Sequence, residues 1–215
     1  MKTLLTISAF VRPARFLPVA AMLVLAGCSM FKAQPDATRY YLLSAPETVA
    51  ADATAAIAAK PPIGLRRIEL PAYLRTAAIA LRSGGTEMRY ATDARWAEPL
   101  EQSIAQTLAS ALQYRVAAGP VVVYPAPYAA KPFYEVKVRV QACEGTEGAV
   151  GRQVRFVAQW EIRVTKDNPD LAPLATGVFT APVQEWTEGD YADLTAKLGE
   201  AVAALGGEIG RALAR

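Results

Sequence analysis

The chain has 215 residues, of which 23 are basic, 20 are acidic and none is histidine. The absence of histidine excludes a Ser-His-Asp triad, a Cys-His pair and a His-ligated metal site, and the sequence has neither a P-loop nor a Rossmann fingerprint. These exclusions predict a protein that is not an enzyme and that uses neither a cofactor nor a metal ion.

The first residues have the three parts of a secretory signal: a basic start, the apolar run of residues 16–26 and small residues at a cleavage point. The apolar run is shorter than the about 20 residues that span a bilayer, so residues 1–27 are predicted to be a removable signal peptide. Residues 25–28, Leu-Ala-Gly-Cys, match the lipobox of bacterial lipoproteins. We predict cleavage between Gly27 and Cys28 and acylation of the Cys28 thiol, which anchors the chain to a membrane. The alternative is an ordinary buried cysteine behind a secretion signal.

Removal of the signal peptide changes the charge of the mature chain. Three of the 23 basic side chains leave with it, so 20 basic and 20 acidic side chains remain. A neutral chain lacks the positive field of a nucleic-acid binder, and no nucleic-acid partner is expected. Ser29, the neutral residue after Cys28, favours transfer to the outer membrane. With Cys28 lipidated, Cys143 is the one remaining cysteine, which excludes an intramolecular disulfide.

Residues 28–38 mix polar residues with a proline and show no apolar periodicity, which predicts a lipidated, flexible tether. Residues 39–215 are enough for one domain with a substantial core and too few for two. The first strand of this domain is expected at residues 39–43. An Ala-rich surface loop is expected to follow it at residues 45–62.

The next expected strand covers residues 63–70. Its apolar residues change parity at the pair Arg66 and Arg67, which predicts a bulge at that point. Two further strands, at residues 78–82 and 87–90, are expected to form a hairpin with Gly84 and Gly85 in its turn.

Between these strands, Pro71 is expected to interrupt the chain with a stiff turn. Such a turn presents Tyr73 and Leu74 without committing them to alternating positions of a sheet. We predict that Pro71, Tyr73 and Leu74 form part of a partner-binding surface, because a buried aromatic residue often dominates binding energy. The alternative is that both side chains fill one end of the core.

Two long helices are predicted. The first is expected to start near Asp93 or Trp96, with Pro99 in its first turn, because apolar residues follow at a strict four-residue spacing. These residues are Trp96, Leu100, Ile104, Leu108 and Leu112. The second, C-terminal helix is marked by Leu194, Leu198, Val202, Leu205 and Ile209. It should carry an ion pair between Asp193 and Lys197, and Gly206, Gly207 and Gly210 should permit its close packing on the sheet.

Residues 134–142 and 154–164 alternate apolar and polar side chains, which is typical of strands with one buried face. We expect an acidic loop at residues 144–151 to join them as a hairpin, and a further strand at residues 174–183. The fold class is therefore predicted to be α+β: a single domain with a mixed, largely antiparallel β-sheet and two long helices packed on one face.

Three groups of residues are weaker candidates for function, and each has a simpler interpretation. The acidic cluster Glu185, Glu188, Asp190 and Asp193 is typical of a solvated turn before a helix. Cys143 has the polar parity of its strand, so it is either a reactive thiol or a residue packed at an edge. Six arginines between residues 66 and 95 either bind an acidic partner or lipid phosphates, or cover a solvated sheet face.

Three segments carry a resemblance to a known family. They are residues 39–43; the run 63–81, with Glu69-Leu70-Pro71-Ala72-Tyr73-Leu74; and residues 88–100, with Tyr90 and Arg95-Trp96-Ala97-Glu98-Pro99-Leu100. With the lipobox, they resemble the PqiC (YmbA) type of ABC-transport auxiliary lipoproteins, which are membrane integrity-associated transporter subunits. The long Ala-rich loop departs from the family's pattern.

The resemblance implies a non-enzymatic docking subunit of an envelope lipid transport system. Cys28 would hold the domain at the outer membrane, facing the periplasm. The implied partners are an MCE-domain protein of the PqiB or MlaD kind and an inner-membrane permease complex. One alternative is a lipoprotein that scaffolds or activates a cell-wall synthesis enzyme, and another is an envelope hydrolase that uses paired carboxylates.

Overall fold

The computed structural model describes residues 36–43, 60–115, 119–125, 132–148, 151–165 and 172–215. The predicted signal peptide, the cleavage point at Gly27 and Cys28, most of the predicted tether and most of the Ala-rich segment lie outside the described residues. Within the described residues, no helix is both long enough and apolar enough to cross a bilayer. The following description concerns the unit Thr38–Arg215.

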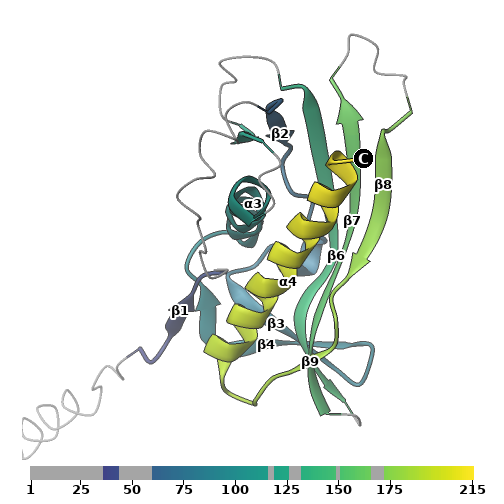
Figure 1. Ribbon diagram of the computed structural model, residues 1–215. Helices are drawn as coiled ribbons and strands as arrows, with labels where there is room; N and C mark the ends of the chain where they lie inside the picture. Colours follow the sequence, from purple (N-terminus) through teal and green to yellow (C-terminus); the bar gives the residue numbers. More distant parts are fainter. Residues whose placement is uncertain (1–35, 44–59, 116–118, 126–131, 149–150, 166–171) are drawn as a thin grey trace, which may run out of the picture. The chain divides into compact units, whose positions relative to one another are not determined.

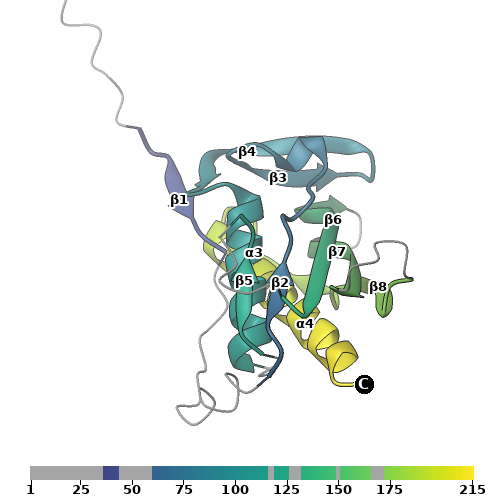
Figure 2. The same ribbon diagram turned by 90° about the horizontal axis from the view of Figure 1, so that it is seen from above.

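Nine described strands form one mixed sheet (Figure 1). Their bounds are β1 (Arg39–Tyr41), β2 (Ile63–Leu65), β3 (Ala78–Ser83), β4 (Glu87–Trp96), β5 (Val121–Val123), β6 (Tyr134–Gly148), β7 (Gly151–Val164), β8 (Ala175–Thr180) and β9 (Gln184–Glu185). The order along one path is β1-β4-β3-β6-β2-β5, and β7 pairs with β6, β8 and β9. Figure 2 shows that the sheet curls, with β3 and β4 turned away from β6 and β7.

The prediction of a largely antiparallel sheet is not confirmed. Among the described strands, β3–β4, β6–β7, β7–β8 and β7–β9 are antiparallel, whereas β1–β4, β2–β5, β2–β6 and β3–β6 are parallel. The alternating pattern identified the long hairpin of β6 and β7. It did not identify the parallel pairs, because alternation shows which face of a strand is buried and not the direction of its neighbour.

Two helices cover the sheet, as expected. They are α3 (Leu100–Ser110) and α4 (Tyr191–Leu213), and the π-helical turn η3 (Ala111–Arg115) continues α3. The helix α4 contacts β6, β7 and β8, and it packs against α3 and η3 (Figure 1). The core lies between these helices and the inner side chains of the sheet, which include Val136, Val138, Phe156 and Ile162.

The first helix starts later than predicted. The strand β4 continues to Trp96, whose amide donates to the carbonyl oxygen of Ala77 at 2.6 Å, and α3 begins at Leu100 with Pro99 as its N-cap. Proline disfavours helical backbone at the residue before it, so the helix cannot extend further toward the N-terminus. Trp96 is still a core residue, with 4% of its surface exposed.

The predicted bulge at Arg66 and Arg67 is confirmed. Leu65 pairs with Val136, whereas Glu69 pairs with Arg139, so this segment has one more residue than the partner strand β6. The two arginines are exposed, while Leu65 and Ile68 on either side are buried. The extra residue therefore lets both apolar halves of the segment face the core.

A second bulge, which was not predicted, lies in β6. Val140 pairs with Ala158 and Ala142 pairs with Val157, which leaves Gln141 as the extra residue. After this bulge, the side chains that follow point to the opposite face of the sheet from the one that the sequence pattern predicts. Cys143 is therefore buried, although it occupies a polar position in the alternating pattern. The prediction of an acidic loop at residues 144–151 is wrong, because β6 continues to Gly148 and β7 already begins at Gly151.

The C-terminal helix has the predicted apolar face and the predicted ion pair, with Lys197 Nζ 2.7 Å from Asp193 Oδ2. Two of its glycines, Gly206 and Gly207, behave differently from the prediction. A Cβ on Gly206 would lie 2.7 Å from the Cβ of Ala111, so this glycine permits close packing of α4 on η3 and not on the sheet. Gly207 meets only the end of the Arg211 side chain.

Candidate functional site

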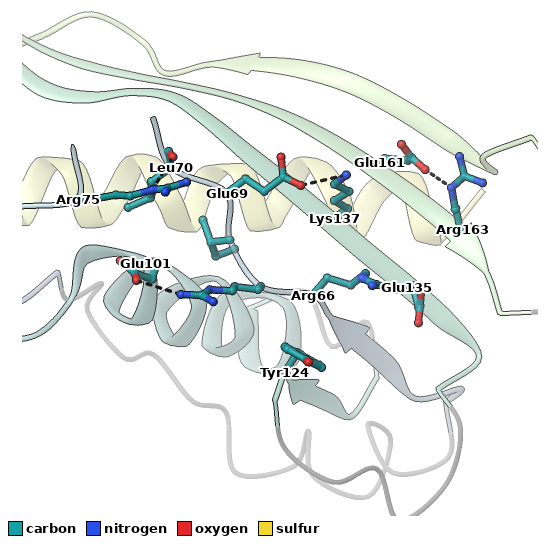
Figure 3. Close-up of a pocket in the computed structure, with 12 residues that line it drawn as sticks. Arg66, Glu69, Leu70, Arg75, Glu101, Tyr124, Glu135, Lys137, Glu161 and Arg163 are labelled. Carbon is teal, nitrogen blue, oxygen red and sulfur yellow. Dashed lines mark hydrogen bonds and ion pairs between the residues drawn. The ribbon is translucent and has the colours of Figure 1, made fainter. Parts of the chain in front are cut away.

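A groove with a volume of about 720 Å³ lies along the outer face of β6 (Figure 3). The bulged segment that follows β2 forms one wall, and the outward side chains of β6 and β7 form another. The groove is lined by Arg66, Arg67, Ile68, Glu69, Leu70, Arg75, Glu101, Tyr124, Glu135, Lys137, Glu161 and Arg163. Nine of these residues are charged, five of them basic and four acidic, so the groove suits a polar, charged partner.

Opposite charges are paired along this groove. Arg66 Nη1 lies 3.1 Å from Glu135 Oε2, and Arg67 Nη2 lies 3.8 Å from Glu101 Oε1. The Arg66 and Arg67 side chains are 58% and 77% exposed. Exposed ion pairs of this kind contribute only about 0–1 kcal/mol to stability. The two arginines can therefore exchange their present carboxylates for those of a partner at little cost.

The Glu69 carboxylate forms ion pairs with two cationic side chains. Arg139 Nε lies 2.7 Å and Lys137 Nζ lies 3.0 Å from its carboxylate oxygens. Hydrogen bonds from Arg139 and Lys137 hold the pKa of the Glu69 carboxyl below its ordinary value. Since two cations share one carboxylate, this part of the outer sheet face has a local excess of positive charge.

The six arginines between residues 66 and 95 do not form one patch. Arg66, Arg67 and Arg75 line the groove. Arg82 instead points to the buried carboxylate of Glu144, and Arg89 lies 3.8 Å from Glu147 on the neighbouring part of β6. The prediction of an acidic partner or lipid phosphates therefore applies to the first three.

The predicted turn at Pro71 is the short helix η2 (Ala72–Leu74), with Pro71 at its N-cap. Leu74 is a core residue with 2% of its surface exposed. Its burial agrees with the alternative interpretation, in which the side chains of Tyr73 and Leu74 fill one end of the core. Tyr73 is half-buried, and its hydroxyl donates to Glu144 Oε2 at 2.7 Å. The partner-binding role of Pro71, Tyr73 and Leu74 stays a prediction, and the burial of Leu74 favours a mainly structural role for that residue.

Beneath this turn, Glu144 forms a buried ionic network that the sequence did not indicate. Its side chain has no exposed surface, and Oε1 accepts from Arg82 Nε at 2.5 Å and from Arg155 Nη1 at 3.0 Å. A buried carboxylate is costly unless it is paired and hydrogen-bonded, as it is here. Glu144 raises the pKa of Arg82, while burial together with the bond to Glu144 raises the pKa of Tyr73.

The acidic cluster before α4 has the simpler interpretation, which is a turn that precedes a helix. Asp190 is the N-cap of α4, and its Oδ1 accepts from the amide of Asp193 at 3.0 Å. Glu188 pairs with Arg152 at 2.5 Å. Across the described residues, no group of three or more Cys, Asp or Glu side chains is arranged to hold a metal ion.

Cys143 is packed in the core with 1% of its surface exposed. Burial raises the pKa of its thiol well above the ordinary value, so the nucleophilic thiolate does not form near neutral pH. Of the two interpretations of Cys143, the structure therefore supports a packed residue and not a reactive thiol. The other candidate thiol, Cys28, lies outside the described residues.

Comparison with known proteins places this fold among its relatives. A family model described as an ABC-type transport auxiliary lipoprotein component matches residues 41–210. The crystal structure of an uncharacterized protein is similar with a TM-score of 0.61 at 18% identity, covering 81% of this chain and 97% of that one. A DUF330-family protein from Xanthomonas campestris is similar with a TM-score of 0.61 at 15% identity, covering 78% of this chain and 91% of that one. At these identities the two structures show likeness of fold alone. No curated protein matches the sequence.

Proposed function

The chain belongs to the PqiC (YmbA) type of ABC-type transport auxiliary lipoprotein components, and on this basis we propose that it is a non-enzymatic docking subunit of an MCE-type lipid transport system. The observation that carries the proposal is the extent of the family match, residues 41–210, which includes most of α4. An auxiliary component acts by binding other components of its transporter.

The proposed location is the periplasmic side of the outer membrane. The lipobox supports an anchor at Cys28, formed after cleavage behind Gly27, and Ser29 supports transfer to the outer membrane. Acyl chains contribute about 0.8 kcal/mol per buried CH₂ group, so an anchor with more than one chain holds the protein stably at the bilayer.

The proposed docking surface is the charged groove. Its exposed arginines, Arg66 and Arg67, are held in weak ion pairs and are free to meet carboxylates of a partner. The proposed partners are an MCE-domain protein of the PqiB or MlaD kind and its inner-membrane permease complex. Pro71 and Tyr73 lie in the segment that follows the groove wall, and their predicted contact with the partner would extend this surface.

Site-specific photo-crosslinking in the intact envelope tests this proposal. The photoreactive residue replaces Arg67 in one variant and Arg89 in the control, because Arg89 is similarly exposed at 62% but lies outside the groove. We expect the variant at position 67 to capture an MCE-domain protein and the control to capture much less. Capture of a cell-wall synthase at position 67 would overturn the proposal in favour of the scaffold alternative.

A further inference from the structure

The strand β1 and the residues just after it are apolar on both faces. Residues 40–43 read Tyr-Tyr-Leu-Leu. Two of them face the core, because Leu43 is 6% exposed and Tyr41 packs against the buried cluster. Tyr40 and Leu42 alternate with these residues, and they are 63% and 54% exposed. A strand with one solvated face normally has polar residues on that face, so the packing of the domain does not explain Tyr40 and Leu42.

Two arginines lie beside these apolar side chains. Arg39 is exposed at the start of β1, and Arg95 of β4 is the direct partner of Tyr40 in the parallel pair of these strands. Directly opposite residues of neighbouring strands lie on the same face of a sheet. Among the described residues, no carboxylate forms an ion pair with either arginine. The surface at β1 therefore combines exposed apolar side chains with cations that can meet anionic groups.

This surface lies close along the chain to the proposed lipid anchor. Arg39 follows Cys28 by 11 residues. A flexible chain of this length has a mean end-to-end distance of about 20 Å, and it spans at most about 40 Å when it is fully extended. An apolar surface tethered this near a bilayer meets lipid at a high effective concentration. The short connection therefore favours the bilayer itself as the occupant of the surface.

We infer that the β1 surface, formed by Arg39, Tyr40, Leu42 and Arg95, binds the interface of the phospholipid bilayer that carries the anchor. A tyrosine ring suits this depth, because its apolar body contacts acyl chains while its hydroxyl stays hydrated. The arginines can donate hydrogen bonds to lipid phosphates. The inference rests on the proposed anchor at Cys28, but it does not depend on the identity of the transport partner.

Contact at β1 would give the anchored domain a preferred orientation. Acyl chains on a flexible tether hold the domain near the bilayer and leave it free to rotate, whereas a second contact fixes which end of the sheet faces lipid. The strands β1 and β8 lie at different ends of the sheet, with β4, β3, β6 and β7 between them (Figure 1 and Figure 2). The outer face of β8 should therefore stay in water.

Nitroxide labelling of single cysteines tests the contact in the full-length lipoprotein. The purified protein is reconstituted in vesicles of phosphatidylethanolamine with phosphatidylglycerol, and the label is attached to Tyr40→Cys or Leu42→Cys. Acylation blocks the thiol of Cys28, and Cys143 is 1% exposed, so the introduced thiol is the one that reacts. Val178→Cys on β8 is the matched control, because Val178 is 61% exposed.

Collision rates of the label with oxygen, which concentrates in lipid, and with a neutral, water-soluble nickel complex decide the result. We expect oxygen collisions to dominate at positions 40 and 42 and nickel collisions to dominate at position 178. Dominant nickel collisions at position 40 in protein that floats with the vesicles would overturn the inference and leave the anchor intact. Shielding of position 40 from both reagents would indicate a protein contact and would also overturn it. Protein that does not float with the vesicles would overturn the anchor together with the inference.

The lipid composition tests the two arginines separately. Labelled Tyr40→Cys protein should collide less often with the nickel complex in the vesicles described above than in phosphatidylcholine alone, because anionic lipid attracts Arg39 and Arg95. Arg39→Gln with Arg95→Gln should abolish this difference. Arg89→Gln is the control and should keep it, because Arg89 is 62% exposed but pairs with Glu147. Equal melting temperatures check that the variants fold. A difference that survives in the double variant would overturn the role of the arginines in the contact.

Discussion

The hydroxyl group of Tyr73 donates a 2.7 Å hydrogen bond to Oε2 of Glu144, a residue whose side chain has no exposed surface. This bond joins the short helix η2 to the strand β6, 71 residues further along the chain. The carbonyl oxygen of Gln141, the bulged residue of β6, lies 3.2 Å from the same hydroxyl. The bulge and the buried carboxylate together fix the position of the turn that follows the groove wall.

Glu144→Ala should lower the free energy of unfolding by on the order of 3 kcal/mol, because it leaves Arg82 and Arg155 without their shared carboxylate. Denaturant unfolding of the natural and variant chains measures the difference. Glu188→Ala is the control, since its carboxylate is 68% exposed and its pair with Arg152 should contribute less than about 1 kcal/mol. Equal losses in the two variants would contradict the structural role of Glu144.

Gly177→Ala should also destabilise the fold, by about 1–3 kcal/mol. A Cβ on Gly177 would lie 2.6 Å from the indole ring of Trp160, whose Nε1 donates to Glu208 Oε1 at 2.8 Å. The added methyl group must displace this ring from its contact with α4. Gly148→Ala is the control, because no atom lies within 4 Å of the added Cβ. A melting temperature of Gly177→Ala as high as that of the control would show that the ring moves without cost.

The pKa of Glu69 provides a test of the charge arrangement beside the groove. Arg139 and Lys137 lower this pKa in the folded chain. The resulting stabilisation is present above the unfolded pKa of the carboxyl and is lost as the pH falls through the folded value. Arg139→Gln should therefore raise the pKa of Glu69, measured by NMR titration of its side-chain carbon. Arg66→Gln should leave it unchanged, because Arg66 pairs with Glu135.

The lipid anchor is tested at Cys28. Cys28→Ala removes the thiol to which we expect the acyl chains to be attached, so the variant should lose labelling by a radioactive fatty acid and remain an uncleaved precursor. Cys143→Ala is the matched control and should keep its labelling, since Cys143 is buried. Full labelling of Cys28→Ala would rule out this anchor.

The sequence predicted the parts of the fold that depend on local pattern. Alternation at Val136, Val138 and Val140 identified β6, and the change of parity at Arg66 identified the first bulge. The second bulge could not be recognised from the sequence, because Val140 and Ala142 on either side of it occupy equivalent positions of the alternating pattern and both are buried. For this reason the burial of Cys143 and Glu144 was not predicted.

The groove could be predicted only in part. The arginine-rich segment was recognised from composition, but its partners come from distant strands and a helix. Arg66 and Glu135, for example, are separated by 69 residues. Such contacts depend on the order and register of the strands, which periodicity does not encode. Parallel pairing of β2 with β6 brings these charges together.

We propose that the chain docks an MCE-domain protein through the charged groove. The most direct measurement is the affinity of the purified mature lipoprotein for the proposed MCE-domain partner, determined at several salt concentrations. We predict saturable binding that weakens as salt rises and that falls about tenfold in Arg66→Glu with Arg67→Glu, but changes little in Arg89→Glu. Binding that is absent, or that is equally strong in the double variant, would contradict the account.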